Sequence, residues 1–313
     1  MFKEKFPEKE IEVKLISQGG MTLKRHWENG YALEVIQSND WDYVVLQEQS
    51  KLGMGVIIDD DIYFGETANF YEYAKKFNSE VKRTGAETVF FMTWSTKNKP
   101  EEQQILTYAY NQIAKELDAS LAPVGLVWDK LRFVKDFDLY DPDGSHPSVY
   151  GSYVVASTIF STIFKVSTEG VSSEISGNRL SSSGEPSKNM ESLVSISKSE
   201  ANTIQNLSWS VVNELNKRGG FSKINKPELT YEIPTISKNE PIKENVISGR
   251  WYGTSTYSQS YLGLILDITE DNLKLQAKLS YYTPDRVDEF VVKQTEIKGD
   301  ILNIEIFDSL RNM

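Results

Sequence analysis

The chain has 313 residues, of which 39% are hydrophobic and 12% aromatic, and it contains no cysteine. This length suggests two domains, the composition is that of a globular protein with a buried core, and the missing cysteines exclude disulfides and thiolate chemistry. The formal net charge of −11 and a sequence pI near 4.9 disfavour binding to a nucleic-acid backbone, and no apolar run approaches the roughly 20 residues of a membrane span.

Strands and helices alternate along the first half of the chain. A strand is predicted at 11–16, where apolar and polar residues alternate up to a pair of glycines. Three further strands are continuous apolar runs, typical of strands buried on both faces of a parallel sheet, at 43–47, 88–93 and 120–124. Helical spacing of apolar residues predicts helices at 22–36, 66–84, 100–117 and 127–133, and a last one ending near 164. This alternation predicts an α/β fold with a doubly wound parallel sheet.

The composition and hydrophobic pattern change twice along the second half of the chain. Residues 167–187 are rich in serine and glycine, and we expect a mobile or disordered surface excursion there. An amphipathic helix is predicted at 189–217, followed by a linker at 218–245 with paired glycines and three prolines. Short alternating segments then predict a β-meander that forms a barrel or a sandwich, at 249–256, 261–269, 272–281, 287–296 and 300–308. We therefore expect an α/β domain at 1–217 and a small all-β domain at 246–313.

One of the two histidines in the protein, His146, lies in a loop that precedes a helix of small residues. Asp143, three residues earlier, can accept a hydrogen bond from one imidazole nitrogen, which leaves the other nitrogen free to act as a base. Asp141 is an alternative acid whose spacing fits less well, and a simple turn with a surface histidine is the alternative for the whole stretch. Because ligands of such sheets bind beyond the carboxyl ends of the strands, the segments that follow the predicted strands are the candidate site: Gly19-Gly20, Gln47 to Ser50, Thr93 to Ser95 and the loop of Asp143 and His146.

Three of these segments together resemble the SGNH (GDSL-type) hydrolases. Asp-x-x-His-Pro before a helix resembles the last block of that family, Gly19-Gly20-Met21-Thr22 resembles the second, and Leu46-Gln-Glu-Gln-Ser50 resembles the third in a divergent branch that replaces the usual Gly-x-Asn-Asp. The resemblance covers about residues 1–217 and implies a flavodoxin-like sheet. It also implies an esterase that hydrolyses acyl esters, with carbohydrate as a candidate carrier of the acyl group.

The resemblance assigns roles to five residues. It implies that His146 is the base, Asp143 its orienting acid, and the Gly20 amide with the side chain of Gln49, or of Gln47 as competitor, the oxyanion donors. Trp94 follows a strand at the edge of the site, where it either walls a pocket or packs in the core.

The first block of the family, a strand that ends in Gly-Asp-Ser or Gly-Asn-Ser, is not found before Gly20. We therefore expect that the first strand and the nucleophile are missing, and that the chain as given is inactive. Ser17 is a poor substitute because it ends the wrong strand. No signal peptide is visible, so the localisation is left open, with secreted and periplasmic locations among the options.

Several residues have two interpretations that the sequence does not separate. His26 either packs or lies on a solvated helix face, and Trp251 with Tyr252 belongs either to the core of the β domain or to a platform for sugar stacking. The start of that domain resembles lipocalin-like small barrels, although five strands are few for a barrel, so an incomplete domain is the alternative. No metal or cofactor is expected, since neither a Cys/His cluster nor a glycine-rich phosphate loop is present. The rival to an esterase is a catalytically silent relative that binds glycans or a protein partner; the oligomeric state is left open.

Overall fold

The computed structural model describes residues 1–52, 56–58, 61–63, 67–134, 137–180, 186–217, 248–257, 260–271, 274–283, 286–298 and 301–307. Its chain groups into two compact units. The first contains all of the described helices and a parallel sheet, and the second is built from described strands alone. In the described part of the chain, no helix combines the length and the apolar composition needed to cross a bilayer.

Three parallel strands form the sheet of the first unit, in the order β1 (Tyr43–Leu46), β4 (Glu87–Phe91) and β5 (Ser120–Ala122). Val45 of β1 lies opposite Val89 of β4, and Phe90 of β4 lies opposite Leu121 of β5. The expectation of a mixed α/β fold with a parallel sheet is therefore confirmed, with three strands that are each slightly shorter than the apolar runs. Because all three run parallel, their carboxyl ends meet at one edge of the sheet.

The strand predicted at 11–16 is wrong, because these residues form no strand in the structure. Three of its apolar side chains are exposed: Ile11, Val13 and Leu15. An alternating pattern favours a strand only where a neighbouring strand supplies the ladder of hydrogen bonds and a core covers one face. β1 is therefore an edge strand of the described sheet, and its Tyr43 side chain is exposed.

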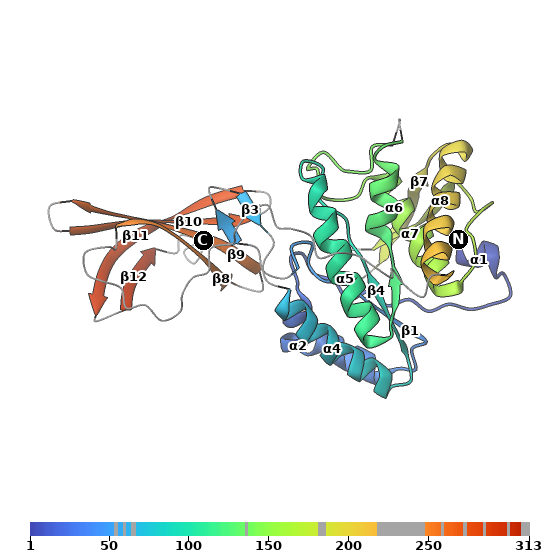
Figure 1. The fold of residues 1–313 in the computed structure, drawn as a ribbon, viewed down its shortest axis with the longest axis horizontal. Coiled ribbons are helices and arrows are strands. Elements are labelled where there is room, and N and C mark those ends of the chain that lie inside the picture. The colour runs from blue at the N-terminus through green and yellow to red at the C-terminus, as the bar shows by residue number, and fades with distance from the viewer. Residues whose placement is uncertain are drawn as a thin grey trace. The chain divides into compact units, whose positions relative to one another are not determined.

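Each face of the sheet is covered by helices. On one face, Phe90 makes an edge contact with Phe70 of α4 (Ala68–Arg83), and Phe70 packs against Tyr110 of α5 (Gln103–Leu117) with ring centroids 4.8 Å apart. Since successive strand residues point to opposite faces, Phe91 enters the other core. That core surrounds the fully buried Trp128 and is formed by α6 (Val124–Leu131), α7 (Val149–Phe164) and α8 (Lys198–Lys217), with α8 beside α7 (Figure 1).

The helix predicted at 22–36 is two helices, α2 (Leu23–Asn29) and α3 (Tyr31–Ser38). Thr22 caps α2 as expected, since its hydroxyl oxygen accepts a hydrogen bond from the Arg25 amide at 3.1 Å. Gly30 ends α2 with a φ of 82°, a left-handed conformation that glycine adopts without strain. The helix expected from residue 100 begins with a turn of 3-10 helix. Phe2 of α1 (Phe2–Lys5) packs against Phe164, and Phe6, which follows this helix, packs against Phe160 and Phe164.

Where the structure describes it, the serine-rich segment forms strands rather than the mobile excursion that we expected. It contains β6 (Glu174–Leu180), which pairs antiparallel with β7 (Pro186–Ser195), so the helix predicted from residue 189 begins only at Lys198. Val194 of β7 is buried in the core around Trp128, opposite Ile175 of β6. Pairing with the next strand along the chain and burial of a few apolar residues outweigh the low local propensity of this segment.

The second unit contains a five-stranded antiparallel sheet in chain order (Figure 1). Its strands are β8 (Gly249–Tyr257), β9 (Ser260–Asp271), β10 (Lys274–Thr283), β11 (Arg286–Lys298) and β12 (Ile301–Phe307). A hairpin of β2 (Val56–Ile58) and β3 (Asp61–Tyr63), which the sequence did not indicate, belongs to this unit. The linker expected at 218–245 lies outside the described residues.

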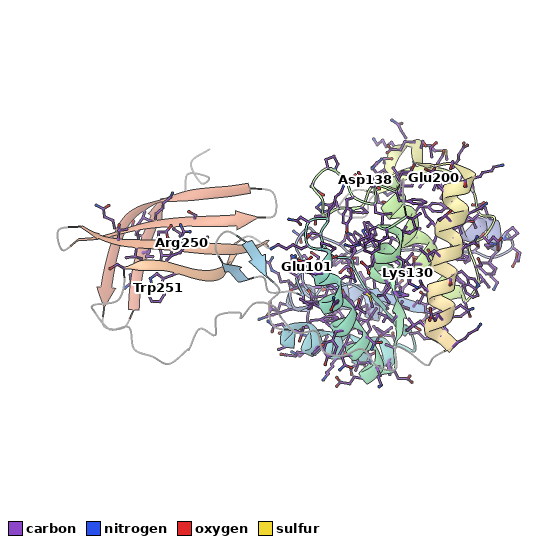
Figure 2. All side chains as sticks on the ribbon, turned by 45° about the horizontal axis from the view of Figure 1, so that its top comes forward. Glu101, Lys130, Asp138, Glu200, Arg250 and Trp251 are labelled. Atoms are coloured by element: carbon purple, nitrogen blue, oxygen red, sulfur yellow. The ribbon has the colours of Figure 1, made fainter. Side chains whose placement is uncertain are left out.

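Trp251 of β8 is 42% exposed, so of its two interpretations the one that places it in the core of the β domain is wrong. Figure 2 shows it on the same strand as Arg250, whose guanidinium pairs with Asp267 at 2.7 Å. The side chain of Tyr252 lies outside the described residues.

Candidate active site

His146 and Asp143 lie in contact in the loop that leads into α7. The His146 Nδ1 is 2.5 Å from the Asp143 Oδ2, and the Asp143 Oδ1 accepts hydrogen bonds from the backbone amides of Ser145 and His146 at 2.8 and 2.9 Å. Both carboxylate oxygens are therefore engaged by groups within three residues of the aspartate. The carboxylate in contact with the imidazole is that of Asp143, whereas the interactions of Asp141 are backbone bonds to Gly144 and His146.

The backbone of this loop is closed on itself. The Asp141 amide donates to the His146 carbonyl at 2.9 Å, and Tyr140 pairs with Pro147 in an isolated β-bridge. Gly144 has a φ of 69°, which allows the tight turn between the aspartate and the histidine. The loop thus brings an acid and a base together by local geometry, before any contact with the rest of the protein.

The residues that follow β4 hold this loop in place. The indole Nε1 of Trp94 donates to the Ser145 carbonyl at 2.9 Å, and the Lys97 amide donates to the Gly144 carbonyl at 2.8 Å. Trp94 also stacks on Trp128 with ring centroids 4.0 Å apart and planes 1° apart. Of the two interpretations of Trp94, the structure therefore supports packing on the core side, with the polar end of the ring bonded to the backbone beside His146.

The electrostatics of the pair favour an ionised acid and a tautomer with a free Nε2. The hydrogen bond from the His146 ring, followed by the two backbone amides, lowers the pKa of Asp143 to about 2. An ionised carboxylate accepts the Nδ1 proton, so the neutral imidazole presents the lone pair of its Nε2. The His146 side chain is 68% exposed, and among the described residues no hydrogen bond is made to its Nε2. The imidazole therefore faces solvent, with its Nδ1 held by a carboxylate.

The second group of predicted site residues lies at the ends of β1 and of the segment before α2. Gln49 is half-buried, and its side-chain oxygen accepts a hydrogen bond from the Lys51 amide at 2.7 Å, which leaves the amide NH₂ available as a donor. Gln47 is exposed, and Gly20 is exposed with a φ of 69° in a turn closed by a bond from the Met21 amide to the Gln18 carbonyl. Both segments thus present hydrogen-bond donors to the surface of the unit.

The segments that follow β1 and β4 share one edge of the sheet, whereas Gly20 follows no described strand. β1 and β4 are neighbours in the parallel sheet, so the segments that contain Gln47 and Trp94 leave the sheet at the same edge. In the described part of the chain, no hydrogen bond joins Gly20, Gln47 or Gln49 to His146. The roles of these residues as oxyanion donors stay a prediction.

Glu48 is a residue of this edge to which the sequence assigned no role. Its side chain is 1% exposed, and it accepts hydrogen bonds from the amide of Leu23 in α2 at 3.2 Å and from the amide of Gln49 at 2.6 Å. Burial raises its pKa to about 7. The signal in the sequence is an acid two residues after an apolar strand, and its burial depends on α2 and α5, which are distant along the chain.

Among the described residues, no hydrogen bond joins the remaining candidates to Asp143 or His146. Ser17 is exposed in the segment without secondary structure, and the Ser95 hydroxyl is buried and accepts a hydrogen bond from Arg132 at 3.0 Å. His26 is half-buried in α2, where burial lowers its pKa. The described side chains form no group of three or more metal-binding residues.

No family model matches this sequence, and no curated protein matches it. Two solved structures align with parts of the chain. One is a candidate SGNH hydrolase from Slackia heliotrinireducens, with 22% identity and a TM-score of 0.38 over 46% of this chain and 80% of that chain. The other is the crystal structure of TesA, with 14% identity and a TM-score of 0.39 over 52% of this chain and 84% of that chain. Both TM-scores are low, so neither alignment by itself assigns a fold or an activity to this chain.

Proposed function

We propose that the first unit carries the acid–base machinery of an SGNH-type serine esterase that hydrolyses acyl esters, with esters on carbohydrate as the expected class of substrate. The observation that carries this proposal is the contact of the Asp143 Oδ2 with the His146 Nδ1, in a loop at the carboxyl edge of a parallel sheet. An imidazole held in this way by a carboxylate is the general base of serine hydrolases on several unrelated folds.

In this mechanism the His146 Nε2 takes the proton of a serine hydroxyl while the serine oxygen attacks the ester carbonyl. The carbonyl oxygen becomes an oxyanion, which the Gly20 amide and the side-chain NH₂ of Gln49, or of Gln47, stabilise by hydrogen bonds. His146 then gives its proton to the leaving alcohol, and a water molecule repeats the sequence to release the acid. Asp143 keeps the proton on Nδ1 throughout and stabilises the imidazolium.

We further propose that the 313 residues as they stand do not supply the serine. The hydroxyl groups of the described residues make no hydrogen bond to the His146 ring, and the one at the end of β4, Ser95, is engaged by Arg132 and the Pro100 carbonyl. We therefore expect the 313-residue chain to show only the residual ester hydrolysis that remains when a serine hydrolase has lost its nucleophile.

The test begins with the DNA upstream of Met1, which is read for an in-frame strand that ends in Gly-Asp-Ser or Gly-Asn-Ser. The 313-residue chain and a chain extended by that segment are then assayed with p-nitrophenyl acetate and a fluorophosphonate probe. Only the extended chain should turn over the ester and be labelled on the added serine. His146→Ala in the extended chain should lower the rate about 10²–10⁴-fold, as expected for loss of a general base, whereas His26→Ala, which removes the second histidine, should leave the rate unchanged.

Two outcomes would contradict this proposal. Rapid turnover by the 313-residue chain, with the probe mapped to Ser17 or Ser50, would show that the nucleophile lies within it. Full activity of the His146→Ala variant in the extended chain would show that the Asp143–His146 pair is not the catalytic base.

A second function, glycan binding without catalysis, is favoured by the exposed indole of Trp251 on the sheet of the second unit. Exposed aromatic faces with polar neighbours are suited to stacking on sugar rings. The test is affinity electrophoresis through gels that contain a polysaccharide. Glycan binding is supported if the unmutated chain is retarded in these gels and the Trp251→Ala variant is not. Met190→Ala is the control, because it removes another exposed apolar side chain from the first unit. Equal mobility in gels with and without polysaccharide would contradict glycan binding.

A further inference from the structure

Glu48 is a buried carboxyl group at the edge of the sheet that carries the candidate site. It follows β1 by two residues, and its side chain is 1% exposed. Its Oε2 accepts a hydrogen bond from the Leu23 amide at 3.2 Å, and its Oε1 accepts one from the Gln49 amide at 2.6 Å. One side chain thus joins the first turn of α2 to the loop after β1.

The backbone of Glu48 is held from a third element. The Tyr110 hydroxyl of α5 accepts a hydrogen bond from the Glu48 amide at 3.0 Å and lies 3.4 Å from the Glu48 carbonyl oxygen, to which it can donate. Tyr110 is fully buried. The carboxyl group therefore has little freedom to move, and the two amides that it binds are fixed relative to α5.

The segments that this carboxyl group joins contain two of the proposed oxyanion donors. Gly20 lies three residues before Leu23, and the Gln49 side chain is oriented by the bond between its oxygen and the Lys51 amide. The Gly20 segment is therefore connected to the loop of Gln49 through the bond from the Leu23 amide to the Glu48 carboxyl group. Catalysis of ester hydrolysis depends on such donors being fixed before the oxyanion forms.

We propose that Glu48 is a positioning residue, whose carboxyl group ties the first turn of α2 to the loop after β1 and so fixes the Gly20 amide and the Gln49 side chain as a pair. The catalytic meaning of this role rests on the proposed function, whereas the structural coupling of the two segments does not.

The protonation state of Glu48 should control this coupling. Burial raises its pKa to about 7, whereas the hydrogen bonds from the Gln49 and Leu23 amides act to lower this pKa, because they stabilise the ionised form. Tyr110 is the titratable side chain that bonds to Glu48, and the neighbouring elements carry the buried Arg25 in α2 and the ion pair of Lys51 with Glu102. Because bonds from amides to an ionised carboxylate are stronger than those to a neutral acid, the tie is strong above about pH 7 and weaker below it.

The experiment is a ¹H–¹⁵N NMR titration of the deuterated full chain between pH 5 and 9. The amide signals of Leu23 and Gln49 should shift with a common midpoint near pH 7, and the Gly20 amide and the Gln49 side-chain NH₂ should shift with the same midpoint. Hydrogen-exchange protection of the Leu23 amide should fall about tenfold on protonation, as expected when a charge-assisted hydrogen bond becomes a neutral one.

The matched variants are Glu48→Gln, which should abolish the common titration step, and Glu101→Gln, which removes an exposed acid (Figure 2) and should retain it. The titration of the unmutated chain tests the proposal even if Glu48→Gln fails to fold. The proposal is overturned if Leu23 and Gln49 do not titrate together, or if they do so while Gly20 and the Gln49 side chain stay unchanged. Absence of esterase activity in the extended chain would contradict the proposed function alone, since the NMR signals do not depend on turnover.

Discussion

Replacement of Gly151 by alanine should destabilise the first unit, because this glycine is where α7 meets Trp128. A Cβ atom built on Gly151 would lie less than 3.0 Å from the Leu139 carbonyl oxygen and from two carbons of the Trp128 ring. Trp128 is fully buried and stacked on Trp94, so it has little room to move. Overpacking of this kind costs up to about 3 kcal/mol, and the better helix propensity of alanine returns about 1 kcal/mol. The net loss is about 2 kcal/mol, which for a unit of this size lowers the melting temperature by about 4–8 °C.

The assay is thermal unfolding of Gly151→Ala followed by tryptophan fluorescence and by near-ultraviolet circular dichroism, in which the stacked pair of indoles contributes. Ser152→Ala is the control, since Ser152 is exposed on the same helix and its replacement gains helix propensity without a clash. It should melt at or slightly above the temperature of the unmutated chain. A Gly151→Ala variant that melts together with Ser152→Ala would refute the close approach of α7 to Trp128.

Three further predictions concern the candidate site. Trp94→Phe keeps an aromatic ring but loses the hydrogen bond to the Ser145 carbonyl, so denaturant unfolding should show a loss of about 1 kcal/mol; no loss would mean that this bond contributes nothing to stability. Hydrogen bonds lower the pKa of Asp143 from 3.8 to about 2, so its contribution to stability is present above pH 3.8 and is lost as the pH falls through about 2; a ¹³C carboxyl titration can measure this pKa. Asp143→Asn should release His146 from the tautomer with the proton on Nδ1. An unchanged tautomer in the imidazole ¹⁵N spectrum of this variant would contradict the pairing. Burial raises the pKa of Glu48 from its ordinary value of 4.5 to about 7, so the folded chain loses stability, on the order of 3 kcal/mol, as the pH rises from 4.5 through 7, because the cost of burying the charge exceeds the strengthening of its two amide bonds. Urea unfolding of the unmutated chain and Glu48→Gln at pH 4.5 and 8 should therefore give different stability gaps, and equal gaps would contradict the raised pKa.

The parts of the fold that the sequence predicted are those whose signals are local. Continuous apolar runs identified β1, β4 and β5, because a strand buried on both faces needs apolar residues at every position. Helical spacing identified α4 and α5 to within a few residues, and the turn signals gave the five strands of the second unit in their observed order. In each case the segment carries its own pattern, and no distant partner is needed to recognise it.

The parts that the sequence missed depend on partners elsewhere in the chain. Residues 11–16 have the alternation of a strand, yet they form none in the described structure, because alternation gives no hydrogen-bonding neighbour. The segment that contains β6 has a composition typical of a mobile loop, yet it pairs with β7 and buries part of that hairpin in the core. Gly30 divides one predicted helix into two. From the sequence alone, this glycine could equally have been tolerated inside a single helix.

The candidate site divides in the same way. The contact between Asp143 and His146 could be predicted from the sequence, because three residues with a tight turn between them fix the two side chains by local geometry. The indole bond of Trp94 to the loop, and the burial of Glu48 against α2 and α5, could not be predicted, because they join segments that are far apart in the chain. The sequence by itself therefore determined which aspartate and which histidine form the pair. Only the tertiary structure decided which groups hold them, because burial and hydrogen bonding between distant segments arise from packing rather than from neighbours along the chain.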